Sequence, residues 1–68
     1  MTAISKVKQT LATLKGAEST LRMYYVQEQN KESKEIYRES IKEINKINME
    51  LEKRIGAMEF EEPQYKGN

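Results

Sequence analysis

The chain has 68 residues and a mass of 8.0 kDa, which leaves room for one small domain at most. It contains no Cys, His or Trp and every acidic residue is Glu, which excludes a zinc knuckle, a thiol nucleophile, a disulfide and an imidazole base. We therefore expect no enzyme and no cofactor. The 12 Lys and Arg residues nearly balance the 11 Glu residues, and this balance argues against nucleic acid as a partner.

The first half of the chain predicts one amphipathic helix, from about Ala3 to about Gln29. Its apolar residues alternate at spacings of three and four, which is the pattern of a heptad seam interrupted only at Glu18. Thr2 stands where an N-cap side chain would satisfy the first free amides. The apolar seam positions are Ile4, Val7, Leu11, Leu14, Leu21 and Tyr25.

Residues 29–33 predict a tight turn. They include no Gly or Pro to build a longer loop, so the chain reverses over few residues and the two helices must pack antiparallel. Asn30 suits this place in two ways, because it can end the first helix in the left-handed region or cap the next helix. The predicted fold class is all-α, an antiparallel two-helix hairpin.

The second half of the chain predicts a second helix, from about Lys31 to about Phe60. It repeats the heptad pattern and has Asn48 as its single polar break. Beyond it, residues 61–68 are predicted to leave the hairpin as an extended tail. The apolar seam positions of the second helix are Tyr37, Ile41, Ile44, Leu51, Ile55 and Met58.

The register of the hairpin follows from the position of the turn. If the turn centres near residues 30 and 31, the numbers of facing residues add up to about 62. This register places Tyr25 opposite Tyr37, and it places Glu18 and Asn48 in adjacent layers. We expect a hydrogen bond between Glu18 and Asn48, or from either to Lys15, and interpret the polar pair as a device that fixes the register.

The two sides of the predicted hairpin differ in polarity. A lone hairpin buries too little apolar surface to offset its ordering entropy, so we predict that two hairpins join through their apolar sides. The result is a homodimeric four-helix bundle with a two-fold axis, whose dimer face includes Ala17, Tyr24, Ile36, Ile47 and Ala57. The charged flank carries Lys8, Lys15, Arg22, Arg38, Asn45, Glu52 and Glu59; the apolar flank carries Ala3, Thr10, Ala17, Tyr24, Ile36, Ile47 and Ala57.

Three further features have alternative interpretations. A line of small residues on the first helix, Ala12, Gly16 and Ser19, is either a second contact surface that supports a tetramer or an unconstrained exposed face. The tail, with its aromatic Tyr65, is either a recognition peptide or a frayed end. Two copies of Glu18 near a dyad could bind a small ligand or a hard cation, although two buried carboxylates more often share a proton.

The polar faces argue against insertion into a membrane. Lys and Glu alternate along residues 39–53, whereas helices that lie in a membrane surface have a basic polar face. Tyrosines beside Arg and Lys near the turn are a feature of single-strand binding, but the intervening glutamates would repel phosphates. We expect a soluble, unexported chain without nucleic acid or membrane insertion.

Two segments are distinctive as sequences, VKQTLATLKGA at residues 7–17 and EEPQYKG at residues 61–67. Both resemble the domain of unknown function 1657 family, short proteins from spore-forming Bacillota, and the tail segment is the more specific signal. The resemblance extends over the whole chain, but the Ile-, Lys-, Glu- and Asn-rich middle of the second helix differs from the Gln- and Ala-rich family pattern. Single residues that also fit the family pattern are Leu21, Gln29, Asn30 and Tyr37.

The resemblance implies a sporulation context and no enzyme, because family members are typically encoded beside spore membrane proteins, including channels for dipicolinic acid. It further implies a cytoplasmic, spore-associated module that docks onto a spore membrane protein through the tail. The alternative is the helical bundle that binds a cation or small ligand at Glu18. The docking residues that the resemblance carries over are Lys15, Gly16, Ala17, Pro63, Gln64, Tyr65 and Lys66.

Overall fold

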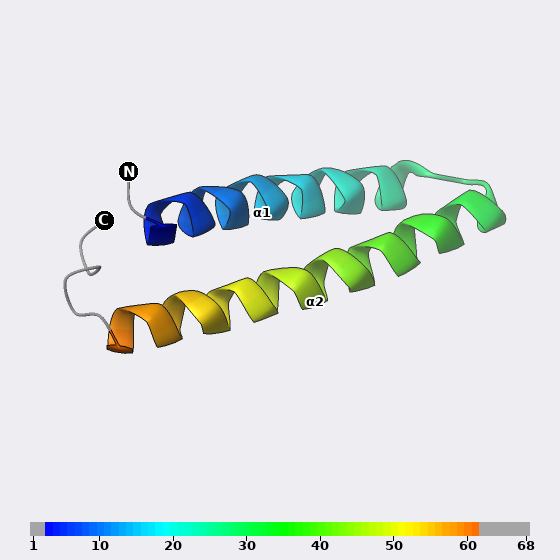
Figure 1. The fold of residues 1–68 in the computed structure, drawn as a ribbon. Helices are drawn as coiled ribbons and strands as arrows, with labels where there is room; N and C mark the ends of the chain where they lie inside the picture. The colour runs from blue at the N-terminus through cyan, green and yellow to red at the C-terminus, as the bar shows by residue number, and fades with distance from the viewer. Residues whose placement is uncertain (1–2, 62–68) are drawn as a thin grey trace.

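The computed structural model describes residues 3–61 of the chain. They form two α-helices, α1 (Ala3–Gln27) and α2 (Lys31–Glu61), which pack antiparallel as a hairpin (Figure 1). The predicted all-α hairpin is confirmed at this level. α1 ends two residues before Gln29, and α2 includes Glu61, where the sequence predicted the start of the tail. Thr2 and residues 62–68 lie outside the described residues.

Asn30 begins α2 as its N-cap. Its Oδ1 accepts a hydrogen bond from the backbone N–H of Ser33 at 2.9 Å, and its carbonyl accepts one from the N–H of Lys34 at 2.9 Å. This is the standard arrangement by which a cap residue satisfies the free amides of a first turn. The carboxylate of Glu28 accepts a further hydrogen bond, from the N–H of Asn30 at 3.2 Å. Of the two roles that the sequence allowed for Asn30, the structure shows the cap.

The ion pairs between the helices differ from the predicted register, in which the numbers of facing residues add up to about 62, because theirs add up to 67. Lys8 pairs with Glu59 and Lys15 pairs with Glu52, each further along α2 than the prediction placed its partner. The cause is the turn, residues 28–30, which runs outward as an extended connection beyond the end of α1 (Figure 1). An extended residue advances the chain about twice as far as a helical one, so α2 starts beyond the last turn of α1.

The predicted contact between tyrosines involves a different ring. The ring that lies against Tyr37 is that of Tyr24, with ring centroids 6.0 Å apart and planes tilted by 49°. Tyr25, which the sequence placed there, instead has the Nζ of Lys34 over its ring at 4.7 Å. Both contacts join α1 to α2 near the turn. A tilted pair of rings and a cation above a ring are both stabilising arrangements.

The core is a thin seam between the helices. Ile4 and Ile55 are buried, whereas most other apolar seam side chains are only half-buried. The molecule measures 49 × 17 × 13 Å, so in its smallest dimension it is about one helix thick. A rod of two helices cannot surround its own seam, which leaves large apolar side chains exposed: Met23, Tyr24, Val26, Ile36, Ile47, Met49 and Phe60.

Candidate functional site

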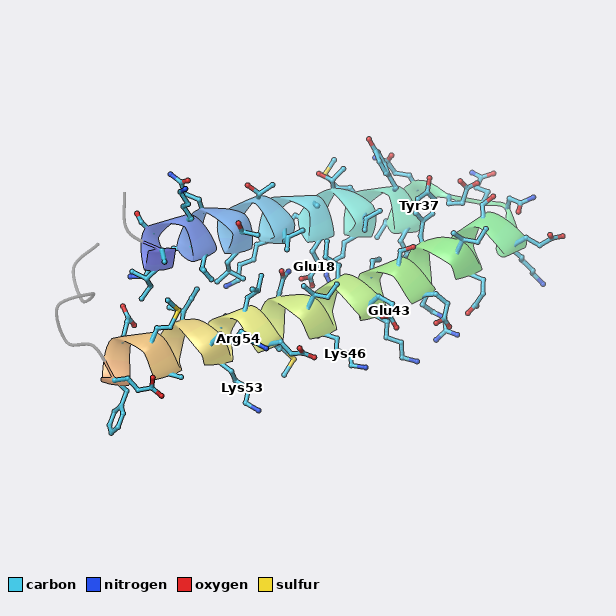
Figure 2. The ribbon with its side chains drawn as sticks, in the orientation of Figure 1. Glu18, Tyr37, Glu43, Lys46, Lys53 and Arg54 are labelled. Carbon is cyan, nitrogen blue, oxygen red and sulfur yellow. The ribbon has the colours of Figure 1, made fainter. Side chains whose placement is uncertain are left out.

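Glu18 is the polar centre of the hairpin. It points from α1 toward α2 (Figure 2), and its Oε1 accepts a hydrogen bond from Nδ2 of Asn48 at 2.9 Å. Its Oε2 accepts hydrogen bonds from Nδ2 of Asn45 at 3.3 Å and from Nη2 of Arg22 at 2.8 Å. The predicted hydrogen bond between Glu18 and Asn48 is confirmed. The carboxylate therefore holds α1 to α2 through two amides and is neutralised by an arginine of its own helix.

The surroundings of Glu18 favour its charged form. The hydrogen bond from Arg22 and those from Asn48 and Asn45 lower the pKa of Glu18 below its ordinary value, against a smaller opposing effect of partial burial. Asn48 is only 2% exposed, and its Oδ1 has no hydrogen-bond partner among the described residues. An unpaired buried oxygen is unfavourable and offsets part of what the hydrogen bond from the Asn48 amide to Glu18 contributes.

The charged flank is joined by polar contacts between the helices. Nζ of Lys8 lies 2.9 Å from Oε2 of Glu59, and Nζ of Lys15 lies 3.6 Å from Oε1 of Glu52. These side chains are between about a third and a half exposed, so each pair contributes roughly 0–1 kcal/mol. Because each pair joins α1 to α2 within one hairpin, these charged side chains have partners without a second chain.

The apolar flank remains open. Tyr24, Ile36 and Ile47 are 47%, 66% and 47% exposed, and the small residues Ala17 and Ala57 of the same flank are exposed as well. The sequence placed these five residues on one dimer face, and the helices do carry them on one side of the hairpin. The structure describes a single chain, in which nothing covers this flank among residues 3–61.

Threonine hydroxyls on the same side of α1 have partners within the helix. Oγ1 of Thr10, Thr13 and Thr20 donates to the carbonyl four residues earlier, at 2.9, 3.1 and 3.1 Å. A hydroxyl that is bonded in this way presents its methyl group outward, so the surface of α1 can be buried without losing a hydrogen bond. Sequence reasoning missed Arg54, which lies seven residues after Ile47 and brings a charge onto the α2 part of the flank.

The docking residues of α1 do not share one face. Lys15 belongs to the charged flank through its ion pair with Glu52, and Ala17 is exposed on the apolar flank. Gly16 lies between them on the outer face, where an added Cβ would meet nothing within 4 Å. Consecutive residues of a helix point about 100° apart, so these three cannot contact one flat partner together. Pro63, Gln64, Tyr65 and Lys66 lie outside the described residues.

A groove near the turn was not predicted. Arg22, Tyr25 and Val26 line it from α1, and Arg38 and Ile41 line it from α2; we call it the turn-end groove. The sequence placed tyrosines beside Arg and Lys near the turn, but it gave no sign that Arg22, Tyr25 and Ile41 line a common groove.

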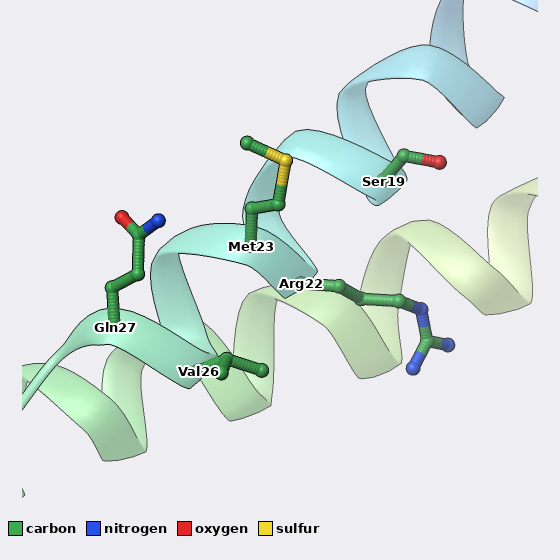
Figure 3. Close-up of a pocket in the computed structure, with 5 residues that line it drawn as sticks. All are labelled: Ser19, Arg22, Met23, Val26 and Gln27. Atoms are coloured by element: carbon green, nitrogen blue, oxygen red, sulfur yellow. The ribbon is translucent and has the colours of Figure 1, made fainter.

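Two hollows adjoin the turn-end groove. One continues from Arg22 and Val26 along the outer face of α1, where Figure 3 shows Met23 and Gln27 on one side and the extended Arg22 on the other. The second shares Tyr25 and Arg38 with the groove and adds Lys31, Lys34 and Glu35. The groove therefore has an apolar side and a cationic side.

The described residues hold neither a cluster of metal ligands nor a membrane span. Between residues 3 and 61, no group of three or more acidic side chains is placed to hold a metal ion. Within the same range, neither helix has a stretch long and apolar enough to cross a membrane.

The family model described as "Protein of unknown function (DUF1657)" matches residues 7–55. That range includes the first of the two distinctive segments and most of both helices, but not the tail segment, so the match is shorter than the whole-chain resemblance. No curated protein and no solved structure matches the chain. With a family model that spans both helices and the turn between them, the chain belongs to the DUF1657 family.

Proposed function

We propose that this chain is a non-enzymatic interaction module that works as a homodimeric four-helix bundle, with two hairpins joined through their apolar flanks. One observation carries the proposal: Tyr24, Ile36 and Ile47 lie exposed together on one flank, whereas ion pairs between the helices run along the other. Exposed apolar side chains gathered on one side of a small protein mark an interaction surface. A second copy offers the same surface, and a two-fold axis makes the two copies complementary.

The proposal is tested by the mass of the chain in solution. Light scattering at micromolar concentration should give about twice the 8.0 kDa of one chain. Ile47→Lys should give a mass of 8.0 kDa or an unfolded chain, because it places a charge in the interface between the two hairpins. Met49→Lys is the matched control, since Met49 is equally apolar and 60% exposed but lies off the apolar flank. A fully helical wild-type chain of 8.0 kDa would contradict the dimer.

The partner of the bundle is proposed from its family context. We propose that the module works in the cytoplasm of sporulating cells and docks onto a spore membrane protein through its tail, residues 62–68. The support is the family membership together with the sequence of the tail. Deletion of residues 62–68 should then remove the chain from the membrane fraction of sporulating cells while its helicity and mass per bundle persist. Equal recovery of the full and shortened chains in that fraction would contradict the tail as the docking element.

A cation or ligand site at Glu18 is the alternative of a different class. Its specific support is the unpaired, buried Oδ1 of Asn48 beside the Glu18 carboxylate, since hard cations prefer oxygen ligands. Against it, both oxygens of Glu18 already accept hydrogen bonds, and one is neutralised by Arg22. A rise in melting temperature with manganese, calcium or dipicolinate that Glu18→Gln abolishes would favour this alternative over the docking module.

A further inference from the structure

The turn-end groove lies on the charged flank, so the proposed dimer leaves it accessible. Its two arginines are held in place by carboxylates of their own helices. Nη2 of Arg22 lies 2.8 Å from Glu18, and Nη2 of Arg38 lies 2.6 Å from Glu35. In both, the hydrogen bonds within residues 3–61 come from Nε and Nη2, which leaves Nη1 available to an incoming anion. The groove therefore presents two positioned donors.

The rest of the groove is apolar with a cationic border. Val26 is 74% exposed, and Tyr25 and Ile41 are half-buried beside it. Lys34 is fixed over the Tyr25 ring at 4.7 Å, and Lys31 extends the border toward the turn. Four cations and one acid, Glu35, line the groove and the hollow beside the turn, and the two arginines among them are paired with Glu18 and Glu35. A complementary ligand has a carboxylate next to an aromatic or apolar group.

We propose that the turn-end groove binds the segment Glu62-Pro63-Gln64-Tyr65 of a second copy of the chain. The segment combines the two features that the groove requires, a carboxylate at Glu62 and an aromatic ring at Tyr65. Its Pro63 favours an extended backbone, which suits a peptide laid along a groove. Phe60, at the end of α2, is 85% exposed and adds a second aromatic group just before the segment.

The same chain cannot supply the segment. Ile41 and Glu61 are 20 residues apart on α2, which corresponds to roughly 30 Å of helix. Tyr65 follows Glu61 by four residues and can lie at most about 14 Å from it. The turn-end groove is therefore out of reach of Tyr65 of its own chain, and the contact joins two copies.

This contact would regulate the docking proposed above, and in that respect it rests on the proposed function. A tail held in the groove of another copy is not available to a membrane protein, so high local concentration of the module would withdraw tails from docking. The contact joins two different surfaces, a tail and a groove, so each copy can bind one neighbour with its tail and another with its groove. Such a contact can also join dimers into larger assemblies.

The test is an intermolecular measurement on the full chain. Because the chain has no cysteine, Gly67→Cys gives one site for a nitroxide label. Labelled, isotopically silent chain is mixed with unlabelled ¹⁵N-enriched chain, so any paramagnetic broadening reports contact between copies. Amides of the turn-end groove should lose most of their intensity, and chemical reduction of the nitroxide should restore it. No broadening in the groove, or equal broadening along all of α2, would overturn the proposal.

Matched variants locate the contact. Glu62→Gln with Tyr65→Ala in the labelled chain should abolish the broadening, and these changes cannot unfold the helices because they lie beyond α2. Val26→Glu in the enriched chain should also abolish it, because this exposed residue lines the groove. Lys46→Glu with Lys53→Glu is the charge control, since both point away from α1 (Figure 2) and should leave the broadening intact. The mass of the chain that carries Glu62→Gln with Tyr65→Ala separates the two proposals, because without the tail contact only the apolar flanks can hold two copies together.

Discussion

Asn48 is buried against Glu18, with its amide hydrogen-bonded and its carbonyl oxygen unpaired among the described residues. We expect Asn48→Asp to destabilise the chain strongly at pH 7, because a second carboxylate would replace the amide 2.9 Å from Oε1 of Glu18. Asn45→Asp, at an exposed position beside the same carboxylate, should cause a smaller loss because water screens it. Urea denaturation at fixed concentration measures both. Equal losses would contradict a buried Glu18–Asn48 contact.

The charge of Glu18 makes the stability of the chain depend on pH. Because hydrogen bonds in the folded state lower its pKa below the ordinary 4.5, its contribution is present above that value and is lost as the pH falls through the folded pKa. Glu18→Gln should therefore be less stable than the wild type at pH 7, and the difference should shrink below about pH 4.5.

Glu43→Gln is the control for this pH dependence, since no ion pair or hydrogen bond within residues 3–61 involves the exposed Glu43 (Figure 2). Thermal melts of the wild type, Glu18→Gln and Glu43→Gln between pH 3 and 7 measure this pH dependence. If the difference in melting temperature between the wild type and Glu18→Gln stayed constant through the acidic range, Glu18 would not be the source of the pH dependence.

At the scale of the elements, α2 depends on its cap. Asn30→Ala should lower the free energy of unfolding by about 1 kcal/mol, because the N–H of Ser33 loses its acceptor. Asn30→Ser keeps a short oxygen at the cap and should lose much less. Urea denaturation at one fixed protein concentration compares the three chains, and an unchanged stability of Asn30→Ala would show that the cap is not needed for the turn.

Replacement of Gly16 by alanine should stabilise the chain. An alanine there meets nothing within 4 Å and should stabilise α1 by about 1 kcal/mol, through its higher helix propensity. Gly56→Ala, equally open in α2, is the matched comparison. If the line of small residues through Gly16 were a close helix contact, Gly16→Ala would instead lower the mass of the assembly while Gly56→Ala would not.

The helices could be predicted from the sequence, whereas their register could not. The heptad spacing and the cap at Asn30 are local signals, and the bounds of α1 and α2 agree with them to within two residues. The register depends on how far residues 28–30 carry the chain, and a turn without Gly or Pro can be extended as easily as tight. The turn-end groove was not predicted, because a hollow depends on how the side chains of two helices pack together and the pattern along one helix does not show it.

At the scale of the whole molecule, sequence and structure agree on which side of the hairpin is charged. The helical period alone places Lys8, Lys15, Glu52 and Glu59 on one flank, and a difference in register leaves each residue on its flank while it changes the partners. The flanks were therefore predictable, but the pairing across them was not. Arg54 was not among the predicted residues of the apolar flank, although its seven-residue spacing from Ile47 places it there.

Folding and assembly should be inseparable in this molecule. A hairpin with two buried apolar side chains has little core of its own, so a second copy supplies much of the stability and mass action links melting to concentration. A hundredfold increase in concentration should raise the melting temperature of the wild type and of Met49→Lys, by the equivalent of about 2.7 kcal/mol per dimer. Ile47→Lys should melt lower and at one temperature throughout. A wild-type melting temperature that does not change with concentration would mean that the hairpin is stable alone, and the exposed apolar flank would then need another partner.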